Sequence, residues 1–329
     1  MKPEEKKMQR IIAILEERGK KSVELSKKIA LQDKTGYEPL NEAIRFFVEE
    51  FWFDVLHPAL ISIACDAVGG DTEKTVEIGA AIVLLAGAAD IHDDIIDQSL
   101  AKEPIPTVFG KFGRDIAILA GDALLIKGLY ALYQACISLE EKKRQEVLET
   151  VKRAFFEICG GEAKEASIRR KTRVSGQEYL NIIRQKVAAA EATTRIGAIV
   201  GGGTQKEIDL LSHYGRTVGI LMALRNEFID MFEPAELKNR FQKESLPLPV
   251  LLALHDESRR KAILSLLKES ADEKISEKIL DLSIDYRETQ DLIKQMKNWV
   301  DIETGGIFSF NRSRDVLTLL LYSTIEDIQ

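Results

Sequence analysis

Residues 82–97 read IVLLAGAADIHDDIID, an apolar run that ends in a cluster of aspartates. On an α-helix, Asp90, Asp93, Asp94 and Asp97 fall at i, i+3, i+4 and i+7, so their carboxylates share one face. Like charges at this spacing repel each other, and a bound cation would offset that cost. We interpret the segment as a site for Mg²⁺, which proteins hold through one or two carboxylates together with substrate phosphates.

The alternative interpretation of these aspartates is an acidic helix face in contact with solvent. It fits poorly, because the aspartates directly follow residues 82–89, which have the composition of a buried helix. The longer apolar stretch 76–89 contains Glu77 and leads into acidic residues, so we expect a core helix and no membrane span.

Apolar residues recur at spacings of three and four along almost the whole chain, without a convincing alternation of period two. This pattern predicts an all-α fold. No Ser/Gly-rich or Pro-rich linker divides the chain, so residues 1–329 are predicted to form a single helical domain. After an amphipathic N-terminal helix that reaches residue 31, the predicted helices cover residues 41–69 (broken near Pro58), 73–97, 114–138, 140–166, 176–201 and 206–232, with shorter ones to the end.

The composition excludes some classes of protein. A formal net charge of −7 and a pI near 5.4 argue against a nucleic-acid partner, which requires a basic surface. The three cysteines are scattered and lack CxxC spacing, as in proteins of a reducing compartment. The N-terminus has no apolar signal-peptide region, so a cytoplasmic protein is predicted.

The aspartate cluster and the motifs that follow it resemble the trans-isoprenyl diphosphate synthase (polyprenyl synthetase) family. Residues 93–97 are similar to the family's first aspartate-rich motif, DDxxD, and residues 106–108, 112–113 and 117–125 follow in the family's order and spacing. The resemblance extends from about Trp52 to Leu254. It implies an isoprenoid-synthase-type helical bundle around a deep central cavity. It also implies a Mg²⁺-dependent enzyme that ionises an allylic prenyl diphosphate and transfers the prenyl group.

The resemblance also implies roles for individual residues. Asp93 and Asp97 would hold Mg²⁺, with Asp94 in support. Three lysines match basic positions of the family's motifs and would bind the diphosphate: Lys102, Lys186 and Lys243.

Two small residues, Ala89 and Ala88, stand four and five positions before Asp93. In the family, bulky residues at these positions floor the pocket, so alanines are predicted to leave room for a long apolar tail of the substrate. Close helix–helix packing is the alternative explanation, because small residues permit it equally well.

The chain departs from the family at the second aspartate-rich motif. Asn226 and Glu227 stand where two aspartates are expected, and Asp230 is retained. Asn226 and Asp230 share a helix face at i and i+4, so a metal site with oxygen ligands is predicted there. It would carry less charge than the family's motif and bind its cation more weakly.

A second departure concerns the site for isopentenyl diphosphate, the family's co-substrate. Its basic positions read Asp54, His57, Ala86 and Glu103 in this chain. Two carboxylates there would repel a second diphosphate. The sequence therefore predicts that the allylic half of the site is kept and that the isopentenyl half is dismantled.

Three functions remain open at this point: a chain-elongating prenyltransferase, a type I terpene cyclase-like enzyme that needs no isopentenyl diphosphate, and a non-catalytic subunit of a heterodimeric prenyl synthase. Family members pair through helices near the first motif, and the helix around residues 116–133 offers apolar surface. A homodimer, or a heterodimer with a related synthase, is predicted.

Overall fold

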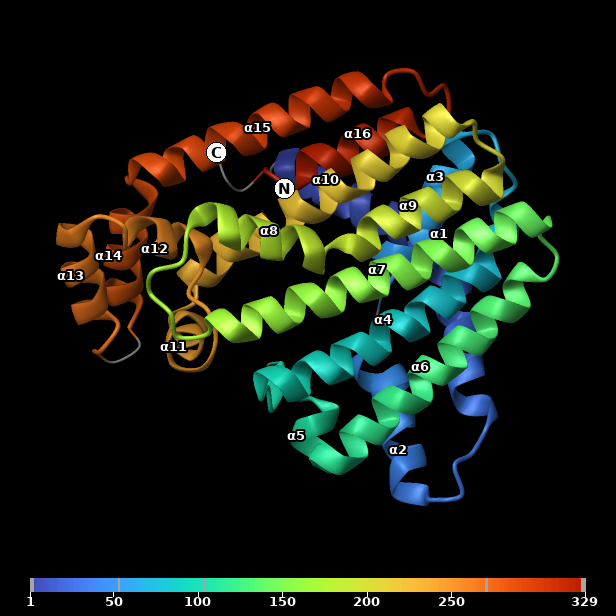
Figure 1. Ribbon diagram of the computed structural model, residues 1–329, viewed down its shortest axis with the longest axis horizontal. Coiled ribbons are helices and arrows are strands. Elements are labelled where there is room, and N and C mark those ends of the chain that lie inside the picture. Colours follow the sequence, from blue (N-terminus) through green and yellow to red (C-terminus); the bar gives the residue numbers. More distant parts are fainter. Residues whose placement is uncertain (1–2, 53, 103, 270–271, 327–329) are drawn as a thin grey trace. The chain divides into compact units, whose positions relative to one another are not determined.

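The structure is a computed structural model that describes residues 3–52, 54–102, 104–269 and 272–326. Almost all regular structure in these ranges is helical, and one two-stranded hairpin is the exception (Figure 1). The predicted all-α class is confirmed. The chain forms two compact units, described here separately. Unit 1 contains residues 1–153, 190–215 and 309–317, and unit 2 contains residues 154–189, 216–308 and 318–329.

Unit 1 is built around helix α4. Its elements in chain order are α1 (Pro3–Gln32), α2 (Glu38–Phe46), the π-helix η1 (Phe47–Phe51), α3 (Leu56–Ala67), the 3₁₀ turn η2 (Thr72–Thr75), α4 (Val76–Asp97), strands β1 (Ala101–Lys102) and β2 (Ile105–Pro106), α5 (Val108–Phe112) and α6 (Arg114–Cys136). It also contains the first part of α7 (Glu141–Ile168), most of α9 (Ala188–Gly201), the first part of α10 (Gln205–Ile229) and the start of α16 (Arg314–Ser323).

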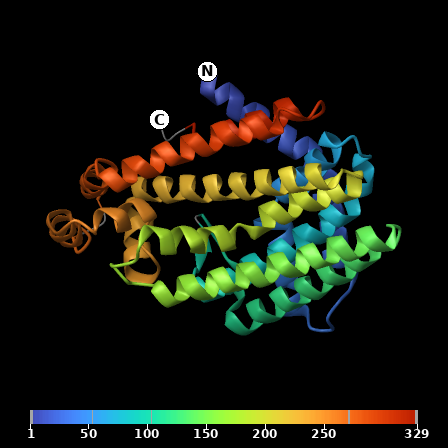
Figure 2. The same cartoon turned by 45° about the horizontal axis from the view of Figure 1, so that its top comes forward.

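Helix α4 is the core helix of this unit because its residues are apolar on nearly every face from Ile78 to Ile91. It packs against α6, α1 and α3, and Figure 2 shows α4 and α6 running alongside each other. Gly197 of α9 lies directly against the backbone carbonyl of Ile61 in α3, where a side chain would not fit. The unit thus depends on close helix contacts at small residues.

The end of α4 positions the acidic segment. Gln98 adopts a left-handed conformation with φ of 58°, which terminates the helix one residue after Asp97. The chain then turns through the β1–β2 hairpin to Thr107, whose hydroxyl donates to the Ser99 carbonyl at 2.7 Å and accepts from the Gly110 amide at 2.9 Å. These bonds hold the hairpin, and Lys102 on it, beside the last turns of α4.

Unit 2 contains the second parts of α7 and α10 and the end of α16. Its other elements are α8 (Gly176–Lys186), the 3₁₀ turn η3 (Asp230–Phe232), α11 (Pro234–Lys243), α12 (Leu248–Ala253), α13 (Glu257–Leu266), α14 (Glu273–Ile284) and α15 (Arg287–Ile307). The short α12 is buried along its whole length and packs against α14 and α15. Pro247 and Pro249 stand at its start, where proline costs no helical hydrogen bond.

One predicted helix was wrong, and one predicted break lies slightly earlier than its proline. The break expected near Pro58 lies before Leu56, because Pro58 sits in the first turn of α3, where its missing amide is harmless. The predicted helix 176–201 is divided at Val187 into α8 and α9.

Within the residues that the structure describes, two helices are long and apolar enough to cross a membrane by length and composition alone: α4 with the turn before it, residues 72–97, and α6. Most of the first is buried within unit 1, as expected of a soluble protein's core helix. Two such helices are weak evidence for a membrane span.

Candidate active site

The aspartates of α4 lie on its last two turns, at different depths. Asp94 is 2% exposed, whereas Asp93 and Asp97 are partly exposed. Among the described residues, three carboxylate oxygens of this segment are buried without a hydrogen-bond partner, namely Asp90 Oδ2, Asp93 Oδ1 and Asp94 Oδ2. Buried oxygens of this kind are costly unless a ligand or cation meets them, so the geometry suits a cation-binding segment.

Lys102 is the cation that the chain itself places on this segment. Its Nζ lies 2.6 Å from Asp90 Oδ1 and 3.1 Å from Asp94 Oδ1, and 5.5 Å above the Phe51 ring. Burial raises the pKa of Asp94 to about 7, with Lys102 opposing this and Asp90 adding to it. The resemblance assigned Lys102 to the diphosphate, and here it bridges two carboxylates.

The remaining carboxylates of the segment fit a metal. Lys102 covers Asp90 and Asp94, but Asp93 keeps its unpartnered buried oxygen. Within the described ranges, no three side chains of His, Cys, Asp or Glu are grouped closely enough to hold a metal on their own. Such a donor set is compatible with Mg²⁺, which takes one or two carboxylates and completes its shell with phosphate oxygen and water.

The positions expected to bind a second diphosphate are occupied by a closed ion pair. His57 Nδ1 lies 2.7 Å from Asp54 Oδ2, and the His57 amide donates to Asp54 Oδ1 at 3.2 Å. Burial alone would raise the pKa of Asp54, but His57 lowers it below its usual value, and Asp54 in turn raises the pKa of His57. The two side chains therefore balance each other's charge, and Ala86 adds no charge. Glu103 lies outside the described residues.

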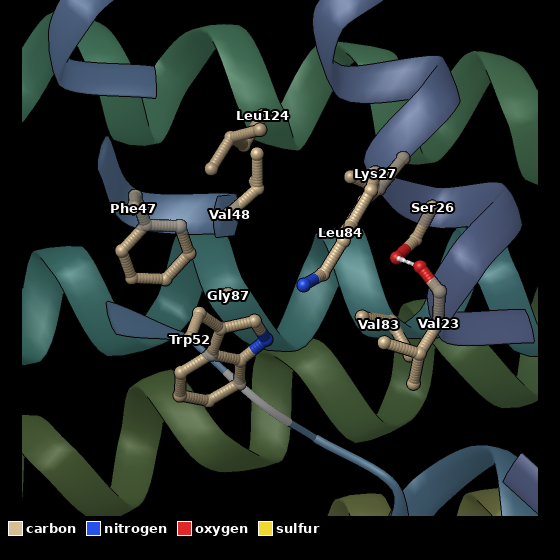
Figure 3. A pocket seen from close by; sticks show the side chains of 10 residues that line it. All are labelled: Val23, Ser26, Lys27, Phe47, Val48, Trp52, Val83, Leu84, Gly87 and Leu124. Atoms are coloured by element: carbon tan, nitrogen blue, oxygen red, sulfur yellow. Dashed lines mark hydrogen bonds between the residues drawn. The ribbon is translucent and has the colours of Figure 1, made fainter. Parts of the chain in front are cut away.

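On the N-terminal side of the acidic segment, aromatic side chains pack beside α4. The Phe47 and Trp52 rings stack with centroids 5.4 Å apart, and a Cβ on Gly87 would lie 2.8 Å from Phe47. Figure 3 shows the small pocket that they line, with the Lys27 amine and the Trp52 indole nitrogen turned into it. That indole nitrogen is buried and has no hydrogen-bond partner in the part of the chain that the structure describes.

The two alanines predicted to line the substrate tail differ in environment. Ala88 is buried in the hydrophobic cluster that contains Phe46, Phe47 and Leu124, whereas Ala89 is partly exposed. Because Ala88 is closely packed, the need for close helix–helix contact is the favoured explanation for a small residue at this position. Room for a long tail stays a prediction.

In unit 2, the two predicted diphosphate-binding lysines differ in their environments. Lys186, at the end of α8, is paired with Glu162 at 3.2 Å and with Glu165, both on α7. Lys243 is exposed at the end of α11. Their roles stay predictions. A lysine held by two carboxylates would have to exchange one of them for a diphosphate oxygen.

The second acidic segment surrounds an arginine. Asp230 Oδ2 accepts from Arg240 Nη1 at 2.5 Å, and both oxygens of Glu227 accept from Arg240 Nη2 at 3.0 and 3.2 Å. Asn226 is exposed. A metal site formed by Asn226 and Asp230 stays a prediction.

The sequence did not predict the hydrogen-bond partners of the residues in these clusters. Arg240 and Tyr179 both contact Glu227, from α11 and α8. Neither has a fixed spacing from the acidic segment that would have revealed it. The ion pair of Asp54 and His57 had a local signal, because a spacing of three residues permits it.

Comparisons with known proteins identify the family of the chain. The family described as polyprenyl synthetase matches residues 55–283. The short chain isoprenyl diphosphate synthase of Methanothermobacter thermautotrophicus is 30% identical over 243 residues, which cover 71% of this chain and 74% of that protein.

Solved structures also share the fold. Geranylgeranyl pyrophosphate synthetase from Pyrococcus horikoshii Ot3 has a TM-score of 0.86 at 25% identity, covering 97% of this chain and 99% of that one. A polyprenyl synthase from Caulobacter crescentus CB15, complexed with calcium and isoprenyl diphosphate, has a TM-score of 0.80 at 20% identity, with coverage of 96% and 97%. The predicted isoprenyl-synthase fold is confirmed.

Proposed function

The chain belongs to the polyprenyl synthetase family, and from this premise we propose that it is a Mg²⁺-dependent prenyltransferase that ionises an allylic prenyl diphosphate. The observation that carries the proposal is the acidic end of α4. Asp93 presents a buried oxygen without a partner there, next to Asp94 and one turn before Asp97. The site would bind a polyanion only through a cation, because its own charge is negative.

In this proposal, Asp93 and Asp97 hold Mg²⁺ and Asp94 supports them. When bound, Mg²⁺ supplies neutralising charge for the diphosphate. The allylic C–O bond breaks with both electrons passing to the diphosphate oxygen, and the resulting allylic cation is captured by the nucleophilic carbon of the acceptor. The positive charge then lies on the acceptor, which loses a proton to the released diphosphate to give the neutral product. Lys186 and Lys243 are proposed to stabilise the departing diphosphate on the strength of their sequence match.

A different acceptor, or no acceptor, is favoured by the Asp54–His57 pair. These side chains neutralise each other at 2.7 Å and offer no surplus positive charge to isopentenyl diphosphate. Ala86 removes another basic position. The second candidate function is therefore a cyclase-like enzyme, or a non-catalytic subunit of a heterodimeric synthase, that does not use isopentenyl diphosphate.

A product assay tests both candidates. Purified protein is incubated with Mg²⁺ and C10 to C20 allylic diphosphates, with and without isopentenyl diphosphate, and the products are identified by mass spectrometry. Elongated products would support chain elongation. Hydrocarbons or alcohols formed without the co-substrate would support the cyclase-like enzyme, and no turnover would support the non-catalytic subunit.

A binding assay tests the site itself. An allylic diphosphate with Mg²⁺ should raise the melting temperature, and isopentenyl diphosphate alone should not. Each lost charge-assisted hydrogen bond weakens binding by roughly 1.5–3 kcal/mol, or about ten- to a hundredfold. Replacing Asp93 and Asp97 by alanine should abolish the allylic effect. Tight, Mg²⁺-independent binding of isopentenyl diphosphate would refute this assignment of the sites.

We also propose a homodimer through α6. Six large apolar side chains on this helix are exposed, and so is Ile137 directly after it: Ile118, Leu119, Ile126, Leu129, Tyr130 and Tyr133. A second copy of the chain, or a related synthase, would cover them. A single helical domain and a cytoplasmic location remain proposals that rest on the sequence.

A further inference from the structure

Arg240 is a buried charged side chain of unit 2. It is 5% exposed, and all three guanidinium nitrogens are engaged. Nη1 donates to Asp230 and Nη2 to Glu227, as described above, and Nη2 also donates to the Tyr179 hydroxyl at 2.9 Å. Nε donates to the Ser245 carbonyl at 2.9 Å. Each nitrogen of the guanidinium therefore has at least one hydrogen-bond acceptor.

The carboxylate of Glu227 is fully occupied by this arrangement. Oε1 accepts from Arg240 and from the Tyr179 hydroxyl at 3.3 Å, and Oε2 accepts from Arg240 and from the Leu248 amide at 2.7 Å. A carboxylate offers about four lone-pair sites, two on each oxygen. None is left on Glu227 for a metal ion.

The charge in this cluster is also unfavourable for a metal. Glu227 and Asp230 contribute two negative charges, and Arg240 contributes one positive charge in direct contact with both. Burial disfavours the charged guanidinium, but Glu227, Tyr179 and Asp230 together raise the pKa of Arg240 well above its usual value. A divalent cation would have to displace or approach a permanent cation.

We propose that Arg240 permanently takes the place of a divalent cation between Glu227 and Asp230, so that of the two acidic segments only the α4 segment binds metal. The inference deepens the proposed function and rests on its assignment of Mg²⁺ to Asp93 and Asp97. The contrast between the segments supports it, because Asp93 has an unpartnered buried oxygen whereas Glu227 has none. Arg240 is thus a positioning residue that orders the second segment without metal.

The test counts bound Mn²⁺ by electron paramagnetic resonance, with and without inorganic pyrophosphate, in four proteins: the unaltered chain, Asp93→Asn, Asp230→Asn and Asp291→Asn. Asp291 is an exposed carboxylate on α15 and controls for the loss of one negative charge in unit 2. Asp230→Asn leaves the contact between Arg240 and Glu227 in place, so it should fold, and circular dichroism verifies this.

The expected result is that Asp230→Asn binds as many Mn²⁺ ions as Asp291→Asn and the unaltered chain, while Asp93→Asn binds fewer. Loss of an ion in Asp230→Asn that Asp291→Asn retains would overturn the inference. A full count of ions in Asp93→Asn would instead refute the proposed metal site on α4, whatever Asp230→Asn does. The two failures are therefore distinguishable.

Discussion

Replacing Arg240 by methionine should destabilise the protein more than any surface substitution, because it removes the cation but leaves its carboxylates. The guanidinium makes hydrogen bonds to four different residues, and it is 5% exposed. Glu227 would keep only the Leu248 amide and the Tyr179 hydroxyl. Removing one partner of a buried ion pair costs about 3–5 kcal/mol. The melting temperature should fall by roughly 4–7 °C.

The assay is urea unfolding followed by circular dichroism, with Arg287→Met as the matched control. Arg287 is 91% exposed in its side chain and lies 3.8 Å from Asp291, so its loss should cost less than about 1 kcal/mol. Arg240→Lys retains the charge but not the planar donor geometry, so its stability should fall between the two. If Arg240→Met and Arg287→Met unfold at the same urea concentration, the argument for a closed ion cluster is refuted.

Three further predictions concern other parts of the chain. Gly197→Ala should lower the free energy of unfolding by about 1–3 kcal/mol, because the new Cβ would clash with the backbone of Ile61. Gly305→Ala places its Cβ in open space and should raise the free energy of unfolding by up to about 1 kcal/mol. A urea titration that ranks the two variants in the opposite order would contradict the packing argument. The folded pKa of Asp94 is about 7 and exceeds its ordinary value of 3.8, so the metal-free protein should lose stability as pH rises between these values. Asp94→Asn should flatten that dependence in thermal melts with EDTA, and an unchanged slope would disprove it. Tyr130→Asp should shift the mass measured by light scattering from that of a dimer toward that of the 36.9 kDa monomer. A monomeric unaltered chain would rule out the α6 interface.

The fold was predictable because periodicity of three and four is a local property of the sequence. The long helices α4 and α6 were expected nearly at their observed bounds, and both carry uninterrupted apolar patterns. The division at Val187 was not expected, because no proline or glycine marks it. Tertiary packing, rather than helix propensity, sets such a boundary.

The candidate site was predictable to the extent that its residues lie close together in the sequence. The aspartate face of α4 follows from spacing alone. The preference of Lys102 for Asp90 and Asp94 depends on a hairpin that returns beside the helix. The partners of Glu227 come from α8 and α11, and no local pattern connects them. Contacts between distant segments require the fold.

The termination of α4 at Gln98 has an electrostatic consequence. Peptide dipoles align along a helix and place about half a negative charge at its C-terminal end. That end coincides with the turn that carries Asp94 and Asp97, so carbonyl oxygens and carboxylates add their negative potentials at the same place. Acidic side chains usually occur at the opposite, N-terminal end of helices, where the dipole favours them. Helix order and cation binding are therefore coupled at the last turn of α4, and the backbone itself contributes to the affinity for a divalent ion.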